Sequence, residues 1–260
     1  MRFAAASLAV LALAACNQQP ETPPAAEEEQ VFMRVPPPWF ICDSVNSGAV
    51  IVFDRNPSGD VRVAEYQKSD GSIVQRIGYF VGDEEPGAGS LHTELVRDQG
   101  SDGWVHMTNS GMLETPASAY TPRFVSVELD GRDVRCRWLP RTRVIGFTSR
   151  RSFVVHEDAN GALTYSAFNF GDAGSSRTRN GAENAQTSAS SLEIVGGVTG
   201  QTQEATTYTF ETQGFRYVLS LNRDGTGALD VTRDGAPLSN EPLIGYQQGT
   251  PPPAPTAATP

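Results

Sequence analysis

Residues 123–138 read RFVSVELDGRDVRCRW and decide the fold class. Two runs of strand-forming residues flank the Asp-Gly pair at 130–131. Asp-Gly is a strong hairpin signal, because both central residues of a type I′ turn take a positive φ. In the second run Arg135 and Arg137 alternate with a valine, a cysteine and a tryptophan. Alternate residues of a strand point to opposite faces, so we expect both arginines to face solvent and the other side chains to face a core.

Runs of the same kind recur throughout residues 39–248. The candidate strands are residues 49–53, 61–66, 73–81, 104–108, 123–129, 134–138, 152–156, 163–170, 206–211, 215–221 and 228–232. Further Asp-Gly or Asn-Gly pairs lie between them, at 70–71, 160–161, 224–225 and 234–235. No window shows a long apolar stripe with helical spacing. The sequence therefore predicts an all-β, antiparallel, hairpin-rich sandwich or barrel.

A weak internal similarity indicates how the body is divided. Residues 62–71 align without a gap on residues 152–161, and the order of features downstream is preserved, although few residues are identical. One interpretation is a duplication into two related β units, residues 39–148 and 149–248, either as separate domains or as two sheets of one sandwich. The other is that any β-rich chain produces such similarities by chance.

The first residues have the pattern of a secretory signal peptide. In residues 1–15 (MRFAAASLAVLALAA) a single positive charge, Arg2, precedes an apolar run that is too short to span a bilayer. The run ends in residues 13–16, LAAC, which resemble the lipobox of bacterial lipoproteins. The resemblance implies cleavage before Cys16, a diacylglycerol group on its thiol and acylation of the new amino terminus, with palmitate among the chains. The alternative is an ordinary signal peptide followed by a chance cysteine.

The lipobox also implies a location. More than one acyl chain holds a protein firmly on a membrane. Asn17 follows Cys16, whereas an Asp at that place retains enterobacterial lipoproteins in the inner membrane. We therefore expect a cell-envelope protein anchored to the outer membrane, on its periplasmic face or on the cell surface. The Pro- and Glu-rich residues 16–38 are expected to be a tether, and residues 249–260 (GTPPPAPTAATP) a disordered tail.

The composition restricts the class of partner. The chain carries 20 basic and 30 acidic residues, a formal charge of −10, which becomes −11 when Arg2 leaves with the signal peptide. An acidic chain is repelled by nucleic acid and by anionic lipid surfaces. We therefore exclude nucleic acid as a partner and expect an envelope protein, above all a basic one, as the candidate.

The cysteines indicate a disulfide. With Cys16 attached to lipid, Cys42 and Cys136 remain, and two cysteines in an oxidising compartment most simply pair. A metal site or a reactive thiol are the alternatives. The chain has no Cys-x-x-Cys, and its three histidines are widely spaced in sequence. We therefore expect no metal site and no cofactor.

Catalytic motifs are absent from the sequence. It has no Gly-x-Ser-x-Gly, no His-Glu-x-x-His, no phosphate-binding loop and no Gly-x-Gly-x-x-Gly, so no catalytic residue is assigned. His156 adjoins the Asn-Gly pair at 160–161 and is interpreted as part of a hairpin end. His92, with Glu94 nearby, and His106 are interpreted as residues on the faces of strands.

Arginines are concentrated between residues 132 and 151 of this acidic chain. Four of them are candidate anion-binding residues: Arg135, Arg137, Arg141 and Arg143. Guanidinium groups hold phosphates and carboxylates through paired hydrogen bonds, so lipid head groups and anionic glycans of the envelope are candidate ligands. The alternative is a solvated face that neighbouring acidic residues neutralise.

Three function classes remain open. The first is a non-catalytic binding or inhibitory module. Residues 40–42 and 49–53 are similar to the corresponding part of membrane-bound lysozyme inhibitors, but the recognition loop of that family is not found, so membership is not assigned. The second is a passive structural lipoprotein of the envelope. The third is a hydrolase of cell-wall or surface glycans that uses two carboxylates flanking a groove.

Overall fold

The computed structural model describes residues 38–97, 100–108, 116–170 and 190–251. The described residues form seventeen strands and one 3₁₀ turn, η2 (Pro116–Ser118), and all strand pairs are antiparallel. The predicted all-β, antiparallel class is therefore confirmed. In these ranges no helix is long and apolar enough to span a membrane. The predictions for residues 1–37 and 252–260 lie outside the described residues.

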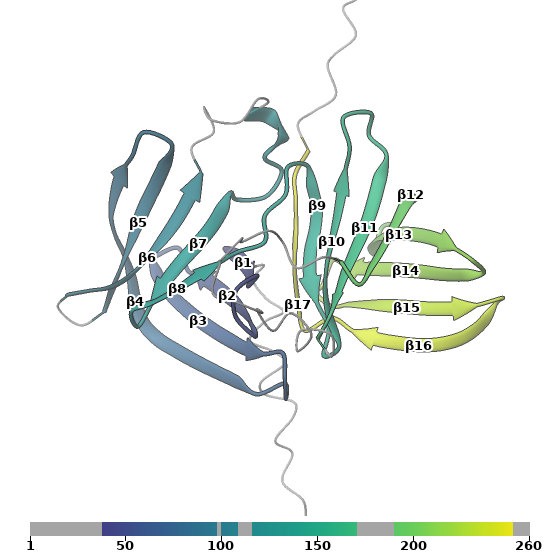
Figure 1. The fold of residues 1–260 in the computed structure, drawn as a ribbon, viewed down its shortest axis with the longest axis horizontal. Helices are drawn as coiled ribbons and strands as arrows, with labels where there is room; N and C mark the ends of the chain where they lie inside the picture. Colours follow the sequence, from purple (N-terminus) through teal and green to yellow (C-terminus); the bar gives the residue numbers. More distant parts are fainter. Residues whose placement is uncertain (1–37, 98–99, 109–115, 171–189, 252–260) are drawn as a thin grey trace, which may run out of the picture.

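The first sheet contains eight strands that are neighbours in chain order (Figure 1). They are β1 (Phe40–Asp43), β2 (Ala49–Arg55), β3 (Asp60–Gln67), β4 (Ile73–Pro86), β5 (Ser90–Arg97), β6 (Gly100–Thr108), β7 (Phe124–Leu129) and β8 (Arg132–Arg135). The sheet curls into a nearly closed barrel, because the segment after β8 returns to β1. There the N–H of Val45 donates to the carbonyl of Arg135 at 2.9 Å, and the N–H of Arg137 donates to the carbonyl of Asp43 at 2.8 Å.

A disulfide crosses this closure. Cys42 on β1 and Cys136 just after β8 are bonded, with their Cα atoms 4.7 Å apart and a sequence separation of 94. The pairing predicted from the cysteine count is confirmed. Both cysteines belong to the apolar cluster inside the first sheet, so the bond joins the first and last strands of the barrel from its interior.

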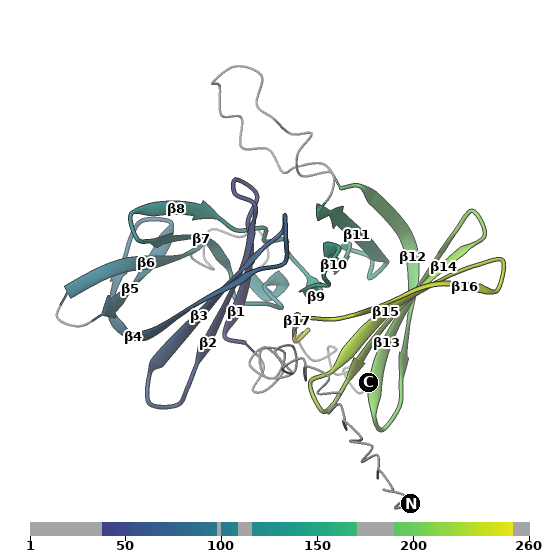
Figure 2. The same ribbon diagram turned by 90° about the horizontal axis from the view of Figure 1, so that it is seen from below.

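The second sheet contains nine strands and forms a half-barrel beside the first (Figure 2). They are β9 (Thr142–Phe147), β10 (Arg151–Glu157), β11 (Leu163–Asn169), β12 (Leu192–Gln201), β13 (Ala205–Thr212), β14 (Phe215–Asn222), β15 (Gly227–Arg233), β16 (Ala236–Pro242) and β17 (Gly245–Gln248). Their order runs from β16 back to β9, with β17 added beside β9. Strand β9, which the duplication would place in the first unit, therefore belongs to the second sheet.

The sheet order offers a parallel to the internal similarity. In the first sheet β3 is the third strand from the edge formed by β1. In the second sheet β10 is the third strand from the edge formed by β17. The aligned residues 62–71 and 152–161 run along these two strands into the turns that follow. In the second sheet, the place of β1 is taken by β17, the last strand within the described residues.

Three apolar clusters stabilise the arrangement. One fills the first sheet and one fills the second. The third lies between the sheets, where Val50 and Val52 of β2 pack in the same cluster as Ile145 and Phe147 of β9. Strand β2 is therefore buried on both faces, and this explains why residues 49–53 (AVIVF) are continuously apolar rather than alternating.

The predicted turns divide into two kinds. Asp130-Gly131 and Asp234-Gly235 have positive φ at both residues, as a type I′ turn requires. At residues 70–71, 160–161 and 224–225 only the glycine has a positive φ, so these loops are longer turns. In the loop at 160–161, Asp158 Oδ1 accepts hydrogen bonds from the N–H groups of Asn160 and Ala162.

The start of the expected tail is held in place by hydrogen bonds. The N–H of Gly249 donates to the carbonyl of Arg143 at 2.9 Å, and that of Thr250 to the carbonyl of Tyr120 at 2.8 Å. The side chain of Gln247 donates to the carbonyl of Trp39 at 2.8 Å. The two ends of the β body therefore lie side by side.

Candidate functional site

The candidate anion-binding arginines do not form one exposed patch. Arg137 is buried, and the expectation that it faces solvent is wrong. Strand alternation correctly separates it from Cys136, but the face it occupies is covered by the second sheet. Its guanidinium lies 3.3 Å from the ring centre of Phe168 on β11, and its Nε donates to Asp43 Oδ2 at 2.8 Å.

Asp43 is the centre of a charge cluster buried between the two sheets. Its carboxylate also pairs with Lys68 Nζ at 2.7 Å and accepts a hydrogen bond from Ser152 Oγ at 2.7 Å. Burial alone would raise the pKa of Asp43, but the charges of Lys68 and Arg137 outweigh burial and lower it. Asp43, Lys68 and Arg137 come from the first unit and Ser152 from β10, so the cluster links the two sheets.

The other three arginines are arranged differently. Arg143 Nε pairs with Glu157 Oε2 at 2.9 Å, and Glu157 also accepts a hydrogen bond from Tyr120. Arg141 is half-buried and has a left-handed backbone, with φ of 54°. Arg135 is half-buried at the end of β8. Of the four candidates, Arg137 is buried and Arg143 is in a partly buried ion pair, so the guanidinium groups of these two already have partners within the chain.

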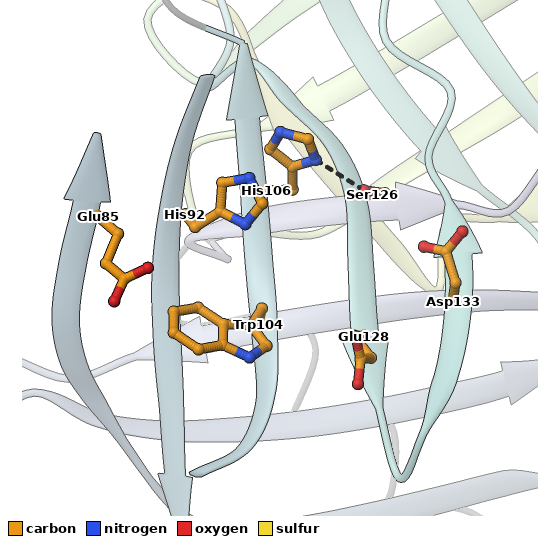
Figure 3. Close-up of a pocket in the computed structure, with 7 residues that line it drawn as sticks. All are labelled: Glu85, His92, Trp104, His106, Ser126, Glu128 and Asp133. Atoms are coloured by element: carbon orange, nitrogen blue, oxygen red, sulfur yellow. Dashed lines mark hydrogen bonds between the residues drawn. The ribbon is translucent and has the colours of Figure 1, made fainter. Parts of the chain in front are cut away.

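A hollow of about 280 Å³ lies elsewhere, on the outer face of strands β4 to β8 (Figure 3). Its lining is polar or aromatic: Glu85, His92, Trp104, His106, Ser126, Glu128 and Asp133. The alternating residues Leu95, Val105 and Val127 on the same strands are buried in the core of the barrel. The lining therefore consists of the side chains that the pleat turns outward.

Strand register places the lining residues in two rows. In the first, Glu85 lies opposite His92, His92 opposite His106, and His106 opposite Ser126. In the second, Trp104 lies opposite Glu128, and Glu128 opposite Asp133. Directly opposed residues have Cβ atoms about 4.5–5.5 Å apart, so the members of each row are direct neighbours on the face of the sheet.

The two histidines are in contact. Their ring centres are 4.1 Å apart with the planes inclined at 35°, and His106 Nδ1 lies 3.3 Å from Ser126 Oγ. Burial lowers the pKa of His106, and the neighbouring His92 lowers it further, while Asp133 opposes both. The indole of Trp104 is beside them, with its ring centre 6.3 Å from that of His92.

The hollow is acidic. Glu85, Glu128 and Asp133 line it, and there is no lysine or arginine among its described lining residues. Across the described ranges, no three His, Cys, Asp or Glu side chains are grouped closely enough to hold a metal ion. The preformed features of the hollow are three carboxylates, an aromatic ring and a pair of imidazoles, which suit it to a cationic ligand.

The hollow cannot be recognised from the sequence alone. The expectation that His92 and His106 lie on strand faces does not bring them together, because they are fourteen positions apart and Asp133 is further still. The signal that could have found the site is the pairing register of β5 with β6, because it makes the two histidines direct neighbours.

Comparisons with known proteins give no relative: no protein-family model, no curated protein and no solved structure matches this chain.

Proposed function

We propose that this protein is a lipid-anchored envelope lipoprotein whose β body is a non-catalytic binding or inhibitory module, and that it captures a cationic group of a basic protein in the hollow of β4 to β8. The observation that carries the proposal is the lining of the hollow: three carboxylates beside the indole of Trp104, with no lysine or arginine among its described members. A lysine or arginine side chain gains from both components, through charge-assisted hydrogen bonds and through the face of the indole.

The charge of the whole chain supports the same partner. A formal charge of −10 attracts a basic protein over distances of about a Debye length, roughly 8–10 Å at physiological ionic strength. Complementary charge of this kind mainly raises the association rate and improves selectivity. Lysozyme is a strongly basic enzyme that attacks the bacterial envelope, so it is the first partner to test.

We expect c-type lysozyme to bind the full chain, and binding to depend on the hollow. Trp104→Ala is expected to weaken binding about tenfold, equivalent to about 1.4 kcal/mol, because it removes the aromatic surface of the hollow. Glu128→Gln combined with Asp133→Asn is expected to weaken binding and to make it less dependent on salt. Calorimetric titration and inhibition of cell-wall lysis measure the two effects.

The matched control is Glu204→Gln, which removes one exposed negative charge from the loop between β12 and β13. It is expected to leave lysozyme binding unchanged. No binding by the unaltered chain would contradict lysozyme as the partner. Equal binding by the control and the hollow variants would contradict the hollow as the site.

The anchor part of the proposal rests on residues 13–16 (LAAC) at the end of the apolar run. We expect Cys16→Ser to move the protein from the membrane fraction to the soluble fraction and to abolish incorporation of labelled palmitate. In an enterobacterial host, Asn17→Asp is expected to keep the lipid but shift the protein from the outer to the inner membrane. Fractionation with immunoblotting measures both shifts, and palmitate labelling that persists in Cys16→Ser would contradict the assignment.

A further inference from the structure

Two of the chain's three histidines line the acidic hollow. His92 and His106 lie on neighbouring strands as direct register partners, with their ring centres 4.1 Å apart (Figure 3). Histidine is the side chain whose ordinary pKa, about 6.5, falls between neutral and mildly acidic conditions. The pair therefore gives the hollow two groups that can gain positive charge when the pH falls slightly.

The surroundings of His106 favour its neutral form. Burial lowers the pKa of His106 and the neighbouring His92 lowers it further, while Asp133 opposes both. The Nδ1 atom of His106 lies 3.3 Å from Ser126 Oγ, and a hydroxyl can serve either tautomer of a neutral ring as donor or as acceptor. The imidazole of His106 is therefore uncharged at neutral pH and gains its proton only on acidification.

The charged groups near the pair come from the strands on both sides of it. Carboxylates on this outward face are contributed by four strands: Glu85 on β4, Glu94 on β5, Glu128 on β7 and Asp133 on β8. A basic side chain, Arg135 on β8, lies opposite Ser126 and continues the row that contains the histidines. Arginine stays protonated in neutral and mildly acidic solution, so Arg135 adds no pH dependence of its own.

Protons on the pair would compete with a bound cation for the same carboxylates. An imidazolium at His92 faces Glu85 across the strand pair, and one at His106 lies within the influence of Asp133. The three carboxylates of the lining carry a formal charge of −3, which two imidazolium groups reduce to −1. The hollow would then hold internal cations in place of an external one.

The pair also lies next to the aromatic surface that a cationic ligand would cover. The ring centres of His92 and Trp104 are 6.3 Å apart. Two unit charges separated by about 6 Å repel enough to weaken binding severalfold even at the dielectric constant of water. A protonated His92 therefore repels a cation placed over the indole, in addition to occupying a carboxylate.

We propose that the histidine pair makes the capture of a cation in the hollow dependent on pH. The hollow holds a lysine or arginine side chain at neutral pH and releases it in mildly acidic conditions, when His92 and His106 take up protons. This inference rests on the proposed function, because it describes the regulation of the same site.

The test uses a ligand whose own charge is constant. Acetylated and amidated tetralysine has no group that titrates between about pH 5.5 and about pH 7.5, since lysine loses its proton near about pH 10.4. Its dissociation constant for the full chain carrying Cys16→Ser is measured by calorimetric titration at both pH values. We expect binding to be at least about tenfold weaker at the lower pH.

Substitutions assign the effect to the pair. For each variant, the dissociation constant at the lower pH is divided by that at the higher pH. His92→Asn/His106→Asn is expected to bring this ratio to within about twofold of one, whatever its affinity at neutral pH. His156→Asn removes the third histidine, on β10, and as the matched control is expected to keep the ratio of the unaltered chain. Circular dichroism verifies that each variant is folded.

The reverse effect gives a second measurement that needs no variant. By linkage, a ligand that binds less tightly to the protonated pair also makes the pair harder to protonate. The imidazole NMR signals are therefore followed against pH with and without saturating tetralysine. The midpoints of His92 and His106 are expected to move down by about one pH unit in total, and that of His156 to stay in place.

The outcomes separate this inference from the proposed function. Tetralysine that fails to bind at about pH 7.5 would overturn cation capture by the hollow and this inference with it. Binding that is equally tight at both pH values would overturn the inference alone. A pH response that persists in the folded His92→Asn/His106→Asn variant, or imidazole midpoints that tetralysine does not move, would also overturn it, because other groups would then take up the protons.

Discussion

The Cys42→Ala/Cys136→Ala double variant is expected to lose about 4–5 kcal/mol of unfolding free energy. The disulfide closes a loop of 94 residues, and a loop of that length restricts the unfolded chain strongly. The bond also lies inside the barrel, where it joins β1 to the segment after β8. Among the described residues it is the only covalent bond that closes the first sheet. Without it the closure depends on hydrogen bonds and packing alone. Urea unfolding followed by circular dichroism measures the change.

The natural control is Cys16→Ser, which removes the remaining cysteine and is expected to leave the unfolding midpoint unchanged. Wild-type protein with its disulfide reduced during unfolding separates the effect of the cross-link from that of the two lost sulfur atoms. A loss below about 1 kcal/mol in both experiments would contradict the assignment, because ordinary surface substitutions already change stability by up to about 0.5 kcal/mol.

The second large effect is expected from Asp43→Asn, which keeps the shape of the side chain and removes its charge. Lys68 and Arg137 would then be left as buried cations without the carboxylate that lies within 2.8 Å of each. Removing one partner of a buried ion pair typically costs about 3–5 kcal/mol. Since the cluster links the two sheets, we expect the loss to affect the whole body, as a lower midpoint of urea unfolding.

Two further variants make this experiment decisive. Asp83→Asn removes an exposed carboxylate on β4 and is expected to change stability by less than about 0.5 kcal/mol. Arg137→Gln added to Asp43→Asn removes one of the unbalanced charges, so the double variant is expected to lose less than the sum of the single losses. Strictly additive losses would show that the groups do not interact.

The sequence was sufficient for the fold class because the evidence for it is local. Alternating runs and Asp-Gly turns lie within stretches of about ten residues, and the cysteine count left one simple pairing. Strands with less typical composition were missed or only partly recognised. Strand β12 contains three glycines, and strand β16 contains two prolines, Pro237 and Pro242. Both residue types are depleted in strands, so pairing with neighbours rather than intrinsic preference places these segments in the sheet.

The sites were less predictable because they depend on what covers each face. The alternation of side chains along a strand places Arg137 on the face opposite Cys136. That face is buried only because Phe168 and Ser152 of the second sheet cover it. The hollow depends on register, since His92 and His106 meet only when β5 pairs with β6 in the observed alignment. Neither the neighbouring sheet nor the register can be read from local patterns in a single sequence.

The position of β17 has a consequence for a chain that folds while it emerges from a channel, amino terminus first. The strands of the first sheet pair in the order in which they appear, so the barrel can close as soon as Cys136 is outside. The second sheet must wait, because the strand that pairs with β9 and contacts β1 is made of residues 245–248. Until then the edge of β9 is unpaired, and an unpaired strand edge can pair with other chains. Pairing with residues 245–248 at the end of the body removes this risk of aggregation.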